Sequence, residues 1–159
     1  MDKKYIVNSL NELLHGIYID INTFEDYIKH SKNENVISQI SKVRSDYQKH
    51  AYRICKIITD LGGNPIEIDN CIDINPYINI DATVIDRELL KKTCEAANNV
   101  LNLGCKLISD PNFINRESYT TINLMNKDYQ KHINHIERYE LYRVVFNKNR
   151  KIVSIHYNS

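Results

Sequence analysis

Apolar residues recur at steps of three and four along four long segments of the chain, which is the pattern of amphipathic helices that share a core. The segments cover residues 9–33, 36–61, 83–108 and 115–140. The stripe of the second segment is the most regular, because its positions alternate steps of four and three over the whole length, as in the seam of a bundle helix. The pattern therefore predicts four helices, each with one buried face.

Capping and breaking residues mark the ends of these segments. The runs Ser9-Leu10-Asn11-Glu12 and Thr83-Val84-Ile85-Asp86 have the spacing of capping boxes, in which two side chains satisfy the first free backbone N–H groups. The run Gly62-Gly63-Asn64-Pro65 ends the second helix, because Gly adopts the left-handed cap conformation and Pro cannot continue a helix. We therefore expect the first and third helices to begin at Ser9 and Thr83.

The lengths of the connections set the expected topology. The first and second helices are joined by a short connection, as are the third and fourth, whereas residues 66–80 form a long connector with apolar residues at alternate positions. Short connections favour antiparallel hairpins, and the long one lets the chain cross the bundle once. The sequence predicts an all-α bundle of two hairpins with one crossover between the second and third helices.

Residues 142–157 have a different pattern, with two short β-branched runs on either side of an Asn-containing turn. We interpret them as a small C-terminal β-hairpin that packs on the crossover, since an isolated hairpin is marginal in water. A flexible tail is the alternative. The expected organisation is one domain over residues 1–159, with a bundle at 9–140 and the hairpin as an appendage.

Composition narrows the class of protein. A chain of 159 residues with 42% hydrophobic and 26% charged residues has enough apolar content for one core, which argues against disorder. Its net charge of +1 gives no global field for nucleic acid or an anionic membrane. The four cysteines form no CxxC pair, and no secretory h-region or membrane-spanning run is present. We expect a cytoplasmic protein with neither nucleic acid nor membrane as a partner.

One pentapeptide occurs twice, as Asp46-Tyr47-Gln48-Lys49-His50 and Asp128-Tyr129-Gln130-Lys131-His132, at an offset of 82. The same offset relates core positions beyond the five letters, namely Ile40 with Ile122, Val43 with Met125, and Ile54 with Ile136. A duplicated helical hairpin with a pseudo-two-fold axis explains this register. Such a duplication places the two pentapeptides opposite each other at similar depth.

The Asp and His of each pentapeptide lie about 40° apart around a helix, because each residue turns it by about 100°. Both therefore project to the same side. His50 and His132 fall within the apolar seams, Asp46 and Asp128 lie at their edges, and Asp20 flanks the seam of the first helix. Inward carboxylates and imidazoles are the ligands of Fe, Mn or Zn in helical bundles. These five residues are the candidate metal ligands.

The chain resembles the ferritin-like superfamily, and within it a bacterial branch of domains of unknown function of about this length. The resemblance spans residues 10–139 and rests on Leu10-Asn11-Glu12-Leu13, on Phe24, and on the Leu61-Gly62-Gly63-Asn64-Pro65 ending. It implies a ferritin-like four-helix bundle. It also implies a di-iron centre with one Glu on each of two helices and Glu-x-x-His on each of the other two.

The sequence departs from that ligand set in two ways. Its repeated pattern is Asp-x-x-x-His, with a shorter carboxylate and a different helical step. Glu88 and Glu95 lie on the polar stripe of the third helix, so this helix supplies no inward carboxylate. A symmetric dinuclear site is therefore disfavoured, whereas a single metal held by His50, His132 and one or two Asp residues stays open.

Two functions remain. The first is a non-catalytic structural or interaction module that self-associates or binds a protein partner, in which His, Asp and Tyr form a buried polar layer and the hydroxyls of Tyr47 and Tyr129 reach a His or Asp. The second is a metal-binding redox or metal-handling protein of ferritin-like descent. The first is preferred because the ligand set is incomplete. No nucleophile elbow, phosphate loop or HExxH motif suggests catalysis.

Overall fold

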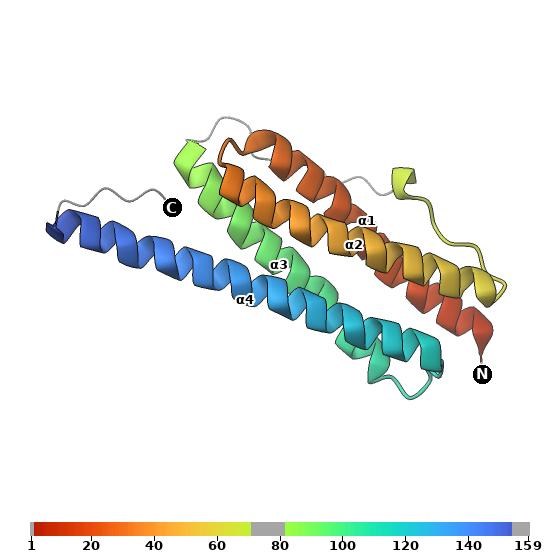
Figure 1. Cartoon of the computed structure of the whole chain (residues 1–159). Helices are drawn as coiled ribbons and strands as arrows, with labels where there is room; N and C mark the ends of the chain where they lie inside the picture. The colour runs from red at the N-terminus through yellow and green to blue at the C-terminus, as the bar shows by residue number, and fades with distance from the viewer. Residues whose placement is uncertain (1, 71–81, 154–159) are drawn as a thin grey trace.

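Four long helices account for most of the structure, a computed structural model that describes residues 2–70 and 82–153, the side chains at 70, 82–85 and 141–153 excepted. They are α1 (Lys3–His30), α2 (Glu34–Asp60), α3 (Ala82–Ile108) and α4 (Arg116–Val153), with a short 3-10 helix, η1 (Ile68–Asn70), after α2. The described residues contain no strand. The predicted all-α bundle is confirmed (Figure 1).

Contacts between helix ends establish the direction of each helix. The Ser31 hydroxyl, just after α1, donates to Asp86 Oδ1 near the start of α3 at 2.6 Å. At the other end of the bundle, the Tyr5 hydroxyl near the start of α1 donates to Asp110, just after α3. α1 and α3 are therefore antiparallel. The segment after α2 lies beside the first half of α1, where the Ile66 N–H donates to Asn11 Oδ1 at 3.0 Å, whereas α3 begins beside the end of α1. The end of α2 and the start of α3 therefore lie at opposite ends of the bundle.

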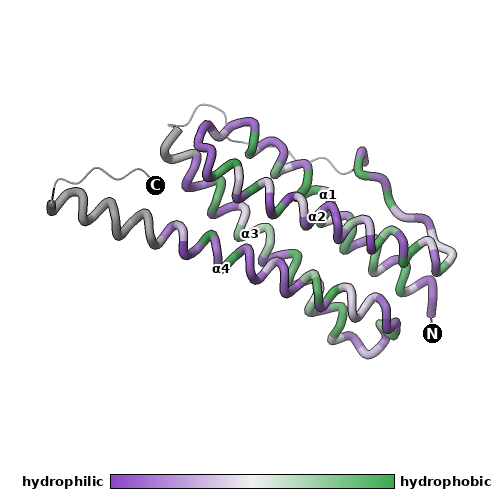
Figure 2. The backbone as a smooth tube through the Cα atoms, viewed as in Figure 1, coloured by the Kyte–Doolittle hydropathy of each residue, from purple (hydrophilic) through white to green (hydrophobic). Residues whose placement is uncertain are grey.

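The bundle consists of two hairpins packed face to face. α1 packs along α2 and α3 along α4, with smaller contacts of α1 with α3 and of α2 with α4. Apolar stripes run along the helices, as Figure 2 shows, and they meet in one buried core. The largest fully buried side chains include Tyr47, Tyr129 and Phe24. Aromatic rings thus fill the middle of the bundle, where the pentapeptides lie.

The predicted start of the first helix is wrong. α1 begins at Lys3, and the Asp2 side chain caps it by accepting from the Tyr5 N–H at 3.0 Å. Ser9 instead lies inside the helix, where its hydroxyl donates to the Tyr5 carbonyl at 2.9 Å. The buried Ile6 extends the apolar stripe by one turn, and this favours the earlier start. α3 begins at Ala82, one residue before Thr83.

The predicted C-terminal hairpin is also wrong within the described residues. α4 continues through the first predicted strand and the turn to Val153, and residues 154–157 lie outside the described part. The chain has no Gly or Pro between Arg116 and Val153 to end the helix. The β-branched residues that suggested strands cost a helix less than about 1 kcal/mol each. The last turns of α4 extend beyond the other helices (Figure 1).

Turn chemistry explains the ends of the first hairpin. The Asn33 side chain accepts from the backbone N–H groups of Asn35 and Val36 and so caps α2. Gly62 has a φ of +82°, the left-handed conformation predicted for the turn after α2.

No described helix has both the length and the apolar character needed to cross a membrane.

Candidate functional site

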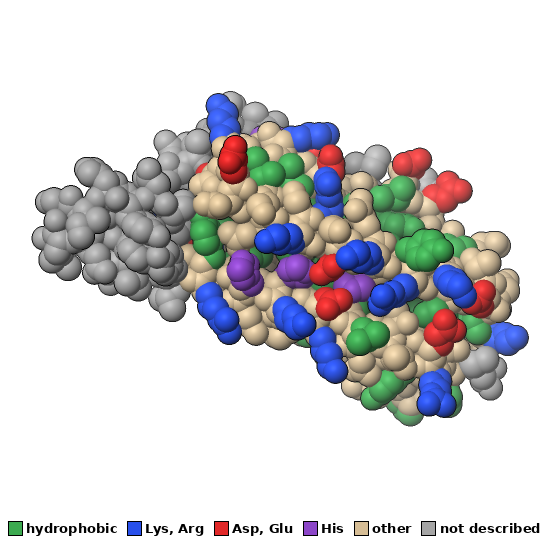
Figure 3. Space-filling view, viewed as in Figure 1, with side chains coloured by type: hydrophobic (Ala, Val, Ile, Leu, Met, Phe, Trp, Pro, Cys, Tyr) green, Lys and Arg blue, Asp and Glu red, His purple; other side chains and the backbone are tan. Residues whose placement is uncertain are grey.

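The two copies of the repeated pentapeptide face each other across the contact between α2 and α4. The two helices are antiparallel there, because His50 meets Asp128 while Asp46 meets His132. Figure 3 shows His and acidic side chains side by side on the face over α2 and α4, with Lys and Arg side chains around them. Asp46, Asp128 and His132 are partly exposed along this seam, with 27%, 39% and 19% of their side-chain surface accessible.

Each Asp pairs with the His of the other helix. His50 Nε2 lies 2.9 Å from Asp128 Oδ2, and His132 Nε2 lies 2.6 Å from Asp46 Oδ2. The side chain of His50 is 2% exposed, whereas those of His132 and Asp128 are 19% and 39% exposed. One pair thus has its imidazole in the core, and both pairs have a solvent-facing edge. We call these four residues, with Tyr47, Tyr129 and Asp20, the polar layer.

His50 has a hydrogen bond at both ring nitrogens. Its Nδ1 lies 3.0 Å from the Tyr129 hydroxyl, opposite the Asp128 contact. Burial lowers the pKa of His50, although the Asp128 carboxylate acts in the other direction. The neutral ring then donates from Nε2–H to Asp128 and accepts at Nδ1 from the Tyr129 hydroxyl. No lone pair of His50 remains for another ligand.

The two tyrosines of the repeat fill the space between the helices. Their ring centroids are 4.6 Å apart, and Phe24 packs edge-on against Tyr47 at 5.0 Å. The Tyr47 hydroxyl donates to Asp20 Oδ2 at 3.0 Å. Burial, together with nearby carboxylates, raises the pKa of both tyrosines well above the ordinary value, so both stay protonated at neutral pH. The predicted contacts of the two hydroxyls with Asp and His are confirmed.

The structure brings the five candidate ligands near one another without forming one cluster. Four of them form the two Asp–His pairs, while Asp20 bonds to Tyr47. Among the described residues, no group of three or more His, Cys, Asp or Glu side chains is placed to hold a metal ion. The reciprocal pairing was not predicted from the sequence. The identical spacing in both copies was its signal, because two antiparallel copies at one height must each place Asp opposite His.

These residues do not fit the di-iron centre that the resemblance implies. The layer has Asp in place of Glu, and the rings of Tyr47 and Tyr129 occupy the space between the inward positions of α2 and α4. On α3, Glu95 is exposed and lies 3.7 Å from Lys92, which keeps its carboxylate on the outer stripe. A dinuclear centre would require the aromatic pair to leave the core.

Comparisons with known proteins identify the fold. No family description matches the chain, and no curated protein matches it in sequence. Among solved structures, a dodecameric thioferritin, the bacterioferritin-related protein of Bacteroides fragilis, is similar with a TM-score of 0.77 and 12% identity over 94% of this chain and 92% of that one.

Two further structures agree. A two-domain protein of Anabaena variabilis, with a DJ-1/ThiJ/PfpI-like and a ferritin-like domain, matches 92% of this chain and 38% of its own, with a TM-score of 0.70 and 16% identity. A ferritin-like, diiron-carboxylate protein of Bacillus anthracis matches 87% of this chain and 96% of its own, with a TM-score of 0.56 and 21% identity. Four helices, two antiparallel hairpins and these likenesses together place the chain in the ferritin-like fold.

Proposed function

We propose that this chain is a non-catalytic structural or interaction module built on the ferritin-like fold. The observation that carries the proposal is the reciprocal pairing of Asp46 with His132 and of Asp128 with His50 around a packed tyrosine pair. The donors and acceptors that would otherwise bind a metal or substrate bind each other. The polar layer takes the place of a metal centre.

The polar layer also specifies how the hairpins dock. A shift of α2 along α4 by one turn would separate both Asp–His pairs and leave the buried His50 without its partners. An unsatisfied buried polar group costs about 1–3 kcal/mol, so wrong registers are penalised. Buried polar groups that fix register at some cost in stability are well attested in helical bundles. The layer therefore gives the module one defined shape.

Self-association is the form of interaction that we propose for this module. The similar Bacteroides fragilis protein is dodecameric, and most soluble oligomers are symmetric assemblies of identical chains. We expect sedimentation velocity to show a species larger than the 18.7 kDa monomer at micromolar concentration. A strictly monomeric protein that also retains no partner from its source lysate would contradict the interaction proposal.

A metal-handling function is the second candidate, and two observations favour it. The Bacillus anthracis protein with this fold is a diiron-carboxylate protein. Each Asp–His pair has a solvent-facing edge and combines one carboxylate with one imidazole, the ligand types of Fe, Mn and Zn. The ligands would be Asp46, His50, Asp128 and His132, with Asp20 in support. Binding one ion would require the Asp–His hydrogen bonds to open.

Metal content distinguishes the two candidates. The parent protein and a His50→Ala/His132→Ala variant would be made in cells supplemented with Fe, Mn and Zn and analysed by elemental mass spectrometry. We expect substoichiometric metal in the parent and the same amount in the variant, because the imidazoles are held by Asp and Tyr. About one metal per chain in the parent and a large loss in the variant would overturn the non-catalytic proposal in favour of metal handling.

A further inference from the structure

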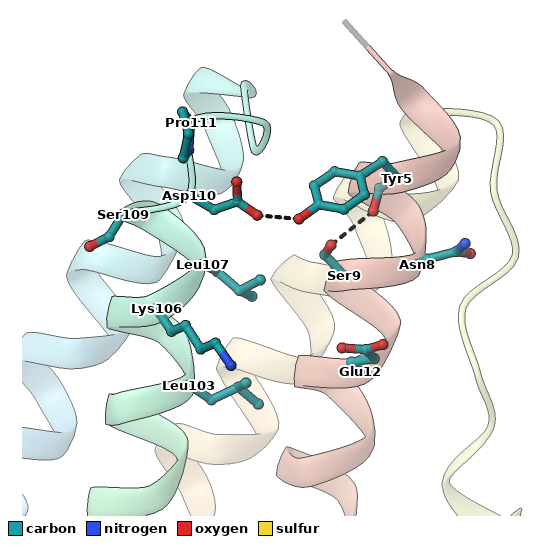
Figure 4. A pocket seen from close by; sticks show the side chains of 10 residues that line it. All are labelled: Tyr5, Asn8, Ser9, Glu12, Leu103, Lys106, Leu107, Ser109, Asp110 and Pro111. Atoms are coloured by element: carbon teal, nitrogen blue, oxygen red, sulfur yellow. Dashed lines mark hydrogen bonds between the residues drawn. The ribbon is translucent and has the colours of Figure 1, made fainter.

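A cavity of about 730 Å³ opens between the start of α1 and the end of α3. In Figure 4 the side chains of both helices surround it, and none of its lining residues belongs to the polar layer. Its volume lies within the range of about 300–1,000 Å³ that is typical of small-molecule sites. On the α3 side the cavity is lined by two apolar side chains, those of the buried Leu107 and the half-buried Leu103.

Most polar groups around the cavity already have partners. The Tyr5 hydroxyl donates to Asp110 Oδ2, and Asp110 Oδ1 accepts from the Asn112 N–H at 2.8 Å. These hydrogen bonds lower the pKa of Asp110, so it is a carboxylate at neutral pH. The Ser9 hydroxyl donates to the Tyr5 carbonyl at 2.9 Å, and the Ser109 hydroxyl donates to the Cys105 carbonyl at 2.8 Å. These groups shape the cavity and have little capacity left for a ligand.

Among the described residues, two oppositely charged side chains around the cavity have no such partner. Glu12 on α1 and Lys106 on α3 are exposed residues that both line the cavity. In Figure 4 the Lys106 side chain extends from α3 toward α1, and the Glu12 side chain lies on α1 across from it. Neither makes an ion pair with the other or with any other residue in the part of the chain that the structure describes. A carboxylate and an ammonium group therefore face the same cavity, with the apolar wall beside them.

We propose that this cavity binds a small zwitterion with an apolar body, such as an α-amino acid with a hydrophobic side chain. The ligand ammonium pairs with Glu12, its carboxylate pairs with Lys106, and its apolar side chain lies on Leu103 and Leu107. A simple anion is disfavoured because Glu12 and Asp110 repel it, and a simple cation is disfavoured by Lys106. Only a ligand with both charges satisfies both helices.

Chemical-shift titration of the ¹⁵N-labelled full chain tests the proposal with defined probes. We expect L-leucine to cause saturable shifts at the amides of Leu103 and Leu107. Isocaproate, which lacks the ammonium group, and isoamylamine, which lacks the carboxylate, should each bind at least about tenfold more weakly, because each loses one charge-assisted contact. Equal affinity for all three probes would overturn the zwitterion assignment.

Charge-neutralising variants locate the contacts. Glu12→Gln should weaken binding of L-leucine and isoamylamine and should strengthen binding of isocaproate, because it removes a repulsive carboxylate. Lys106→Gln should weaken binding of L-leucine and isocaproate and should strengthen binding of isoamylamine, because it removes a repulsive ammonium group. Lys91→Gln is the matched control, because Lys91 is exposed on α3 and does not line the cavity. Unchanged L-leucine affinity in both cavity variants would refute the proposed contacts.

The probe set covers the proposed ligand class. L-valine, L-methionine and L-phenylalanine would be titrated beside L-leucine up to about 20 mM, above the weak millimolar affinities expected of such small ligands. Absence of saturable shifts at the cavity with all four would overturn the proposal. The outcome is independent of the metal test, because the cavity shares no residue with the polar layer.

Discussion

Replacement of Tyr129 with Ala is expected to lower the free energy of unfolding by about 3–5 kcal/mol, as for other large buried aromatic residues. Tyr129 is fully buried, its ring packs on Tyr47 at 4.6 Å, and its hydroxyl bonds to His50. The substitution removes the ring, leaves a cavity in the middle of the bundle and removes the donor to His50 Nδ1. Urea denaturation of the parent and the variant at neutral pH measures the loss.

Tyr119→Ala is the matched control on the same helix. Its side chain is 48% exposed, so truncation should change the free energy of unfolding by no more than about 0.5 kcal/mol. Tyr129→Phe separates ring from hydroxyl and should cost about 1–3 kcal/mol, because it leaves His50 Nδ1 without a donor in a buried position. A Tyr129→Ala variant as stable as Tyr119→Ala would show that the tyrosine pair does not stabilise the bundle.

The four helices and their connectivity could be predicted from the sequence. One face of each helix is buried, so apolar residues recur along the chain at steps of three and four. The regular stripe of α2, from Val36 to Ile57, is buried throughout. Helix ends were less predictable because Asp2 and Ser9 are both good capping residues. Only the packing of Ile6 against the core favours the earlier one. The extension of α4 was missed because β-branched residues have only a weak preference for strands.

The candidate site was predictable in composition but not in pairing. The repeat identified the Asp and His residues and their common side of each helix. It did not show whether each His bonds to the Asp of its own helix or to that of the other one, because a spacing of four residues permits both. Because the two copies are antiparallel, each His pairs with the Asp of the other helix: His50 with Asp128, and His132 with Asp46. Such a choice depends on tertiary geometry.

Replacement of His50 with Ala is expected to lower the free energy of unfolding by about 1–3 kcal/mol at neutral pH. The ring is buried, and its removal takes the partner from both the Tyr129 hydroxyl and the Asp128 carboxylate. His135→Ala is the control, since His135 is exposed on α4 and should change stability by less than about 0.5 kcal/mol. Urea denaturation at about pH 7.5 gives the comparison.

The pH dependence of this difference tests the protonation state of His50. Burial lowers its pKa in the folded state, so the unfolded chain binds this proton more tightly than the folded one. The stability that neutral His50 contributes is complete above its ordinary pKa of about 6.5 and is lost as the pH falls through the lowered folded value. The gap between the parent and His50→Ala should therefore narrow from about pH 7.5 to about pH 5.5. A stability difference that widens toward acid would contradict this prediction. It would mean that the Asp128 carboxylate outweighs burial and holds His50 as the cation. His50 Nδ1–H would then donate to the Tyr129 hydroxyl instead of accepting from it.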